Sequence, residues 1–168
     1  MALARQPLGG YERIGAGMAN HMKSIKQIGF ATTDIERAID NFKALGLTDW
    51  SSVEEVTPEG FEDMVCDGVP QPYSMLCATN FETEVEIELI QPLDDKSDYA
   101  HWLDRLGTWI AMHHLSVETD DEEALRGLGK TLLQAGHSEG VPFGWEYYDF
   151  RDDIGTVLEY FPLPVPRK

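Results

Sequence analysis

The order of the predicted elements constrains the fold of this chain more than any other feature of its sequence. A strand pattern over Ser24–Asp34 leads into an amphipathic helix that Asp34 can cap and Gly46 can end. The apolar face of this helix holds Ile35, Ala38, Ile39 and Phe42. Two strand patterns follow, over Tyr73–Asn80 and Phe81–Leu93.

The same order of elements returns in the second half of the chain. A connecting helix is predicted over Ser97–Gly107, and a strand over Trp109–Asp120 follows it. A helix is then predicted over residues 120–136, because leucines recur there at helical spacing: Leu125, Leu128, Leu132 and Leu133. Strands over 143–150 and 155–161 complete the half. The sequence therefore predicts an α+β fold made of two βαβββ modules.

These boundaries predict one domain over residues 23–163. Module one covers about residues 23–95, the connector covers 96–108, and module two covers about 109–163. Residues 1–22 are rich in glycine and lack periodicity, so we expect a flexible N-terminal arm that packs on a partner subunit. Residues 164–168 form a tail, and residues 53–73, rich in acids and turn-forming residues, predict an irregular excursion.

The composition excludes several classes of partner. The formal net charge of −17 disfavours nucleic acid, although a pocket can still bind a small anion. Cys66 and Cys77 are the only cysteines, which is consistent with a reducing compartment. No apolar run reaches membrane-spanning length, and the first residues lack the hydrophobic core of a signal peptide. We therefore expect a soluble cytoplasmic protein with no membrane partner.

Four polar residues occupy matching places in the two halves. Gln27 and His114 lie in the middle of the first strands, and Glu88 and Glu159 lie in the last strands. Strand alternation places Met112, His114, Ser116 and Glu118 on one face of their strand. The same alternation places His113 with Leu115 and Val117 on the helix-covered face, so we assign His113 to structure.

One imidazole, two carboxylates and one amide oxygen form a reasonable ligand set for a divalent ion. This set does not choose between Zn²⁺, Co²⁺, Mn²⁺, Ni²⁺ and Mg²⁺. Glu84 and Glu86 flank Glu88 and are interpreted as rim residues exposed to solvent. The amide of Gln27 has a second interpretation, because it could simply hydrogen-bond to neighbouring strands, which would leave three ligands or none.

Four segments together resemble the vicinal oxygen chelate superfamily, in particular its glyoxalase I and methylmalonyl-CoA epimerase branch. They are "IKQIGFATTDIERAIDNFKALGL", "VEIELIQPL", "MHHLSVETDD" and "GTVLEYF", in the family's order over Ser24–Pro162. The resemblance implies a cupped mixed sheet with helices on its outer face. It also implies that the first and last strands of each module supply metal ligands, here Gln27, Glu88, His114 and Glu159.

The resemblance points to two branches of the superfamily. Methylmalonyl-CoA epimerases usually have His at the position of Gln27, whereas some glyoxalase I enzymes have Gln there. The segment "ELIQPL", a short helix and the pair "HH" are more similar to the epimerases. We expect a homodimer; in this superfamily the cup closes within one chain or across a dimer.

The chemistry that the resemblance implies is removal of a proton next to a metal-bound carbonyl, through an enolate or enediolate. Glu159 is the expected base and Glu88 its symmetric partner. The substrate would be a small carbonyl compound such as an acyl-CoA, a thiol adduct of an oxoaldehyde, or a keto-sugar or cyclitol. The first hypothesis is thus a metal-dependent isomerase, epimerase or lyase.

Two other classes remain open. One is a non-catalytic drug-binding or metabolite-binding protein of the bleomycin-resistance type, with a pocket lined by Trp145, Tyr147 and Tyr148. The other is an extradiol-type dioxygenase, which is disfavoured because that family's iron site has His where Gln27 stands.

Overall fold

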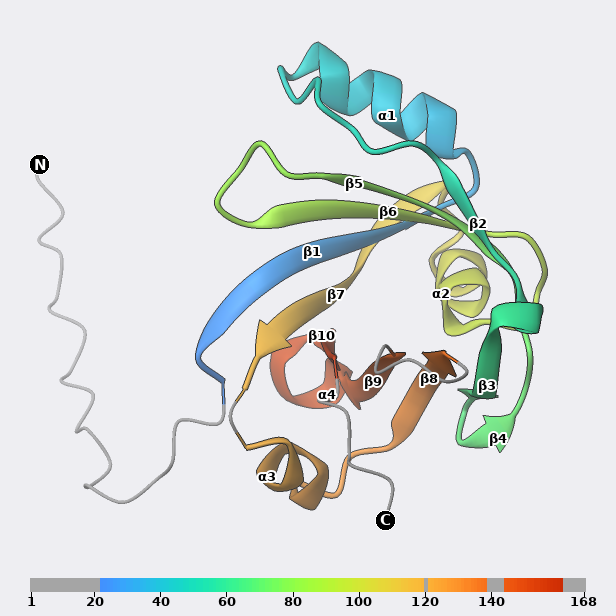
Figure 1. The fold of residues 1–168 in the computed structure, drawn as a ribbon, viewed down its shortest axis with the longest axis vertical. Helices are drawn as coiled ribbons and strands as arrows, with labels where there is room; N and C mark the ends of the chain where they lie inside the picture. Colours follow the sequence, from blue (N-terminus) through green and yellow to red (C-terminus); the bar gives the residue numbers. More distant parts are fainter. Residues whose placement is uncertain (1–21, 120, 139–143, 162–168) are drawn as a thin grey trace, which may run out of the picture.

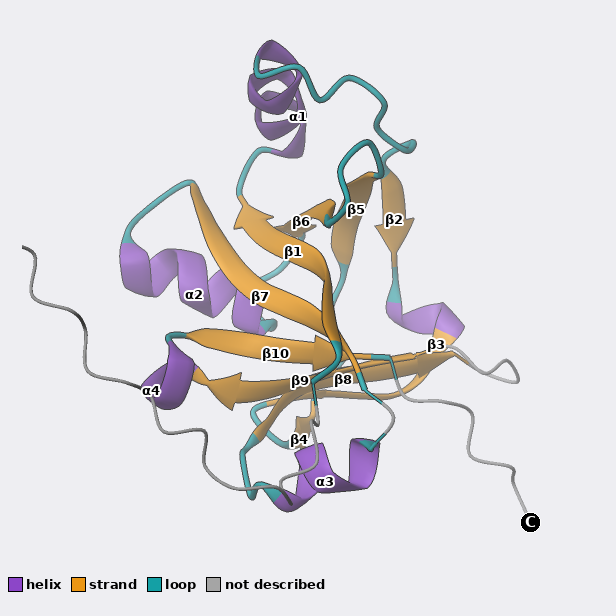
Figure 2. Ribbon diagram, turned by 90° about the vertical axis from the view of Figure 1, so that its left-hand side faces the viewer, coloured by secondary structure: helices purple, strands orange, loops and turns teal. Residues whose placement is uncertain are grey.

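The strands of the computed structural model form one curled sheet, seen from two directions in Figure 1 and Figure 2. The structure describes residues 22–119, 121–138 and 144–161. Its strands are β1 (Ser24–Thr32), β2 (Glu54–Val56), β3 (Phe61–Cys66), β4 (Val69–Pro70), β5 (Met75–Asn80), β6 (Glu86–Pro92), β7 (Ile110–Glu118), β8 (Leu132–Ser138), β9 (Gly144–Phe150) and β10 (Thr156–Tyr160). Its helices are α1 (Ile35–Ala44), the 3-10 turn η1 (Pro58–Gly60), α2 (Asp98–Leu106), α3 (Glu122–Gly127) and α4 (Arg151–Ile154).

The strand order is that of two modules placed side by side. Across the described residues it runs β2-β5-β6-β1-β7-β10-β9-β8-β3-β4. In each half the first strand pairs in parallel with the last, β1 with β6 and β7 with β10. The antiparallel pair β1–β7 joins the halves into a continuous sheet. The predicted α+β fold of two βαβββ modules around a cupped mixed sheet is confirmed.

Helices lie on both faces of this sheet. Asp34 is the N-cap of helix α1, and its carboxylate accepts a hydrogen bond from the backbone N–H of Arg37. The helix packs Ile35 and Ile39 against Leu89 on the outer face. Helix α3 covers the outer face of the second half (Figure 2). Helix α2 lies inside the curl, between the two halves (Figure 1), where Tyr99 joins the inner core.

The helix predicted over residues 120–136 is wrong beyond its first turns. Helix α3 ends at Gly127, and β8 begins at Leu132 and pairs with both β9 and β3. Gly127 is a poor helix former, and Gly129 adopts a positive φ of 69° that a helix cannot contain. The leucine spacing that suggested a helix is therefore split between a short helix and a strand.

The predicted irregular excursion over residues 53–73 is instead largely extended. Strand β2 pairs with β5 at one edge of the sheet, and β3 pairs with β8 at the other edge. Residues 54–70, here called the crossing segment, thus span the open side of the curl, as Figure 1 shows on its right-hand side. Phe61 packs on Trp145, with 4.8 Å between ring centroids, and Met64 enters the inner core. The segment helps to close the cup.

Two sequence predictions fall on the chain ends. The predicted arm over 1–22 and the tail over 164–168 lie outside the described residues, apart from the exposed Met22. Within the described residues, none of the helices is both long and apolar enough to cross a membrane.

Candidate metal and proton-transfer site

The four predicted site residues lie on four neighbouring strands at the centre of the sheet. Strand pairing aligns residues of β6, β1, β7 and β10 in two adjacent rows, and paired residues point to the same face. The first row is Glu88, Gly29, His114 and Val157; the second is Glu86, Gln27, Ser116 and Glu159. The candidate ligands therefore share the inner face, two in each row.

Three of these side chains converge on one atom. Nε2 of His114 lies 3.4 Å from Oε2 of Glu88 and 3.4 Å from Oε2 of Glu159. His114 is fully buried, and the side chains of Glu88 and Glu159 are 17% and 3% exposed. Gln27 lies beside them through the register, and it is 6% exposed. Measured distances thus place Glu88, His114 and Glu159 in contact, and the strand register places Gln27 in the adjacent row.

The atoms that face each other lack hydrogen-bond partners. Among the described residues, the buried polar atoms without a partner include Gln27 Oε1, Glu88 Oε2, His114 Nε2 and Glu159 Oε2. Leaving a buried polar atom unpaired usually costs about 1–3 kcal/mol, so the three atoms that meet at His114, with Gln27 Oε1 in the adjacent row, require an explanation. A cation held by these nitrogen and oxygen atoms would satisfy them together. The chemistry of these donors therefore suits a divalent ion.

The other nitrogen of His114 is fixed by a chain of buried groups. Nδ1 of His114 lies 3.1 Å from Nδ1 of His113, and Nε2 of His113 lies 2.8 Å from Oδ2 of Asp98. Asp98 also pairs with Arg151, and the pKa of its carboxyl is lowered: burial raises it, but His113 and Arg151 outweigh burial. Burial lowers the pKa of His113 to about 4, so this ring is neutral and donates to Asp98.

The chain of bonds sets the tautomer of His114. Because His113 donates through Nε2, its Nδ1 accepts the proton of His114 Nδ1–H. Nε2 of His114 is then the nitrogen free to bind a cation or a proton between the two carboxylates. A metal-bound histidine usually donates its other N–H to such a fixed partner. Nε2 of His114, which lies near both carboxylates, is therefore the nitrogen that would bind a metal ion.

The carboxylates shift the ionisation of the imidazole and of each other. Burial alone would lower the pKa of His114, but the charge of Glu159 and the contacts with Glu88 raise it to about 9. Burial raises the pKa of Glu88. Burial also opposes ionisation of Glu159, yet the charge of His114 outweighs it and lowers that pKa. Without a metal, the site therefore holds a proton on His114 and two unlike carboxyl groups.

The prediction that His113 faces away from His114 is wrong, although its structural assignment is not contradicted. The β1–β7 register shifts between Gly29 and Phe30, which pair with His114 and Met112, so His113 is an extra residue in a β-bulge. The ring of His113 lies 6.0 Å from that of Tyr147, in the inner core, and beside His114. Met112 pairs with Phe30, the residue after the partner of His114, so Met112 and His114 do not share one face as strict alternation predicted. Nothing in the sequence marked this bulge.

The aromatic residues predicted for a binding pocket do not lie together. Tyr147 packs on the inner face, with 4.9 Å between its ring centroid and that of His114, and Trp145 belongs to the same core. Tyr148 lies in the outer core, stacked on Tyr160. The trio therefore does not form one pocket wall.

Glu86 is closer to the site than predicted. It pairs with Gln27 in the second row, it is half-buried, and its charge contributes to the raised pKa of Glu88. Glu84 is exposed, as predicted for a rim residue.

A two-module curled sheet with nitrogen and oxygen donors on its inner face defines a class of protein. Residues 26–136 match the family model of the glyoxalase/bleomycin resistance protein/dioxygenase superfamily. The chain belongs to this family, as the sequence resemblance indicated.

Solved structures with the same fold include three methylmalonyl-CoA epimerases. The enzyme from Mycobacterium tuberculosis has 21% identity and a TM-score of 0.56, covering 88% of this chain and 94% of its own. A variant of the Streptomyces coelicolor enzyme in complex with 2-nitronate-propionyl-CoA has 19% identity, a TM-score of 0.55 and coverages of 86% and 99%. An epimerase in complex with methylmalonyl-CoA and NH₄⁺ has 20% identity, a TM-score of 0.55 and coverages of 83% and 94%. No curated protein matches the chain in sequence.

Proposed function

We propose that this protein is an isomerase or epimerase, with lyase chemistry as a variant, that removes a proton next to a carbonyl group. One divalent ion would be held by Gln27, Glu88, His114 and Glu159. The observation that carries the proposal is the meeting of these buried, unpartnered atoms on the inner face. The family membership and the epimerases among the structural neighbours support the same class.

The ion and the carboxyl groups would have different chemical roles. When bound, a divalent ion would act as a Lewis acid on the carbonyl oxygen and make the neighbouring proton more acidic. Glu159, whose pKa is lowered, is ionised and accepts the proton. Glu159 would then return the same proton to the substrate, at the original carbon or at its neighbour. Glu88, its symmetric partner on β6, would hold the ion as a carboxylate ligand.

The fold supports these roles by position and by shielding. Glu88 and Glu159 come from β6 and β10, and each lies 3.4 Å from Nε2 of His114, so the groups flank the same point. The side chains of Glu88 and Glu159 are only 17% and 3% exposed, and this burial strengthens their electrostatic interactions. The substrate is a small carbonyl compound; the ligands of the epimerase neighbours make an acyl-CoA the first to test.

The test measures exchange of solvent deuterium into methylmalonyl-CoA and into the thiol adduct of an oxoaldehyde, followed by NMR. We expect exchange with one of them, and a loss of about 10²–10⁴-fold in Glu159→Gln, since general base catalysis contributes that much. Glu84→Gln, in the exposed hairpin before β6, is the matched control and should retain full exchange.

Metal content gives a second measurement for the same proposal. Protein purified without chelator should hold about one equivalent more divalent ion than His114→Ala, and Glu84→Gln should hold as much as the wild type. Absence of exchange with every substrate, together with no metal after supplementation, would favour a binding protein and overturn the enzymatic proposal.

A further inference from the structure

A second group of ligand-type side chains lies apart from the His114 site, where the turn between β3 and β4 meets α2. Cys66 ends β3, Asp67 follows it in the turn, and His101 lies on α2. One ligand atom from each of the three lies within 4.8 Å of the other two. The sulfur, carboxylate and imidazole donors come from segments more than thirty residues apart, so the tertiary fold brings them together.

The turn holds Asp67 in a defined place. Asp67 and Gly68 adopt positive φ angles of 51° and 73°, and the Asp67 N–H donates to the Leu133 carbonyl at 2.6 Å. A left-handed conformation is uncommon for a residue with a side chain, although aspartate tolerates it better than most. The bond to β8 thus fixes the backbone of the turn at Asp67.

The imidazole of His101 is oriented in the way that suits a metal ligand. Its Nε2 lies 2.9 Å from the Asp95 carbonyl oxygen, which can only accept, so Nε2 carries the proton. Nδ1 then presents its lone pair, 4.0 Å from Oδ2 of Asp67. A backbone carbonyl that binds the far N–H is the usual outer partner of a metal-bound histidine. A cation between Nδ1 of His101 and Oδ2 of Asp67 would therefore be bound by both atoms.

Cys66 supplies a buried third donor. The residue is 3% exposed, and its sulfur lies near the backbone N–H groups of Asp67 and Asp98. A metal ion bound at this sulfur would displace the thiol proton, because the thiolate is the form that binds a metal. The buried sulfur lies beside a carboxylate and an imidazole, so the three donors can bind one ion together.

We propose that Cys66, Asp67 and His101 form a zinc site that fastens the crossing segment to α2. Zn²⁺ accepts sulfur, nitrogen and oxygen ligands in one tetrahedron, and a water molecule can fill the fourth position beside the two exposed ligands. The side chains of His101 and Asp67 are 42% and 62% exposed, so an ion can reach the site from solvent. The inference does not depend on the proposed function, because the two sites share no ligand.

Cobalt substitution separates the two sites by their donors. Only a site with Cys66 can give a thiolate-to-cobalt charge-transfer absorption, since the His114 site has nitrogen and oxygen donors alone. The full-length protein, stripped with chelator and titrated with Co²⁺, should show this absorption. Cys66→Ser should abolish it and bind about one equivalent less cobalt, while the control Cys77→Ser should retain both.

His101→Gln keeps the test decisive if Cys66→Ser fails to fold. His101 is partly exposed, so this variant should fold, and its cobalt affinity at the thiolate site should fall by about 10-fold or more. No thiolate absorption in the wild type, or one that survives Cys66→Ser, would overturn the zinc site and leave a plain His101–Asp67 ion pair. Failure of the His114 site alone would instead leave the absorption intact and lower the total cobalt.

Discussion

At the scale of single residues, the site depends on a glycine, Gly29, because any larger residue there would collide with the His114 ring. Gly29 lies between Glu88 and His114 in the first row, and the His114 ring lies directly over it. A Cβ added at Gly29 would come within 1.8 Å of Cε1 and 2.2 Å of Nε2 of His114. The space over Gly29 is therefore what allows the imidazole to lie between the two carboxylates.

Gly29→Ala should displace the His114 ring and disrupt metal binding. Overpacking at such a site costs about 1–3 kcal/mol of unfolding free energy, and the altered ring position should abolish ion binding at the His114 site. Denaturant unfolding and a metal titration measure the two effects. Gly60→Ala is the matched control, because its added Cβ meets nothing within 4 Å. Normal metal binding in Gly29→Ala would contradict the placement of His114 over this glycine.

The sequence predicted the residues whose side chains meet at the site, but not the residues that orient those side chains through hydrogen bonds. Glu88 and Glu159 could be matched because strand alternation and the repeated order of elements are local features of the chain. Asp98 and His113 could not, since one bulge in β7 turns His113 inward, where the preceding helix α2 supplies its acceptor. Strict alternation has no means of placing an inserted residue.

At the scale of elements, the sequence predicted correctly those helices and strands in which the capping or turn residues at the ends agreed with the hydrophobic periodicity between them. Helix α1 has a capping aspartate and one apolar face, and it appears where predicted. Strand β8 has leucines at helical spacing but gains its backbone hydrogen bonds from β9 and β3. Tertiary pairing decided the second case, and that pairing is absent from any single window of sequence.

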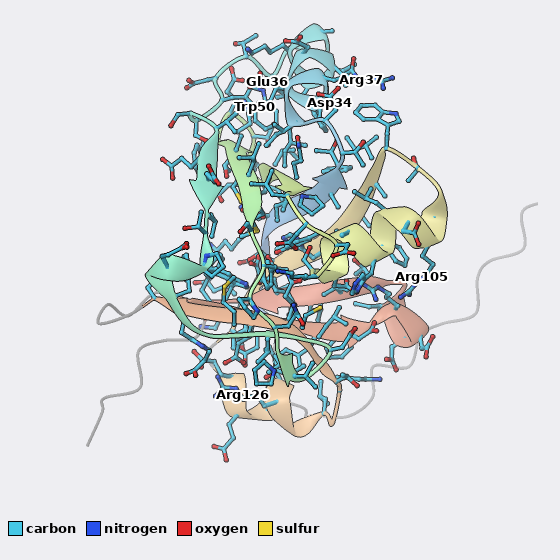
Figure 3. All side chains as sticks on the ribbon, turned by 90° about the vertical axis from the view of Figure 1, so that its right-hand side faces the viewer. Asp34, Glu36, Arg37, Trp50, Arg105 and Arg126 are labelled. Atoms are coloured by element: carbon cyan, nitrogen blue, oxygen red, sulfur yellow. The ribbon has the colours of Figure 1, made fainter. Side chains whose placement is uncertain are left out.

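The short helix α3 is tied to the sheet by a buried carboxylate. Arg126, labelled on α3 in Figure 3, donates to Glu146 at 2.8 Å, and the hydroxyls of Tyr148 and Tyr160 donate to the same group. Burial raises the pKa of Glu146, but Tyr160 and Arg126 outweigh burial and lower it below 4.5. The folded state therefore prefers the ionised form.

This pKa shift predicts an acid-sensitive contribution to stability. A carboxyl whose folded pKa is lowered stabilises the fold above its unfolded value of 4.5, and the contribution is lost as the pH falls through the folded pKa. Glu146→Gln should therefore destabilise the protein at pH 7, and the difference from wild type should shrink below pH 4.5. Urea unfolding at a series of pH values measures it. Glu123→Gln, at an exposed position of α3, should match wild type throughout. A constant difference for Glu146→Gln would contradict the assigned ionisation.

At the scale of the whole molecule, the halves share both a sheet and a core. The β1–β7 pair runs through the centre of the sheet, and the inner core takes Tyr73 from the first half and Tyr147 from the second. The crossing segment then connects the outer edges. The sequence predicted two modules, but it could not predict this second connection, because the partners of β2 and β3 lie at opposite ends of the strand order.

This shared architecture predicts that the halves unfold as one unit. Ile39→Ala removes a buried contact under α1 and Leu125→Ala removes one under α3, and each should cost about 2–5 kcal/mol. Because the halves share β1–β7 and the inner core, each variant should shift one common transition, seen equally by far-ultraviolet and near-ultraviolet circular dichroism. Leu45→Ala, at a position 80% exposed, should leave the transition unchanged. Two separate transitions, with each variant moving only the one that reports on its own half, would show that the halves fold independently and that the central strand pair does not couple them.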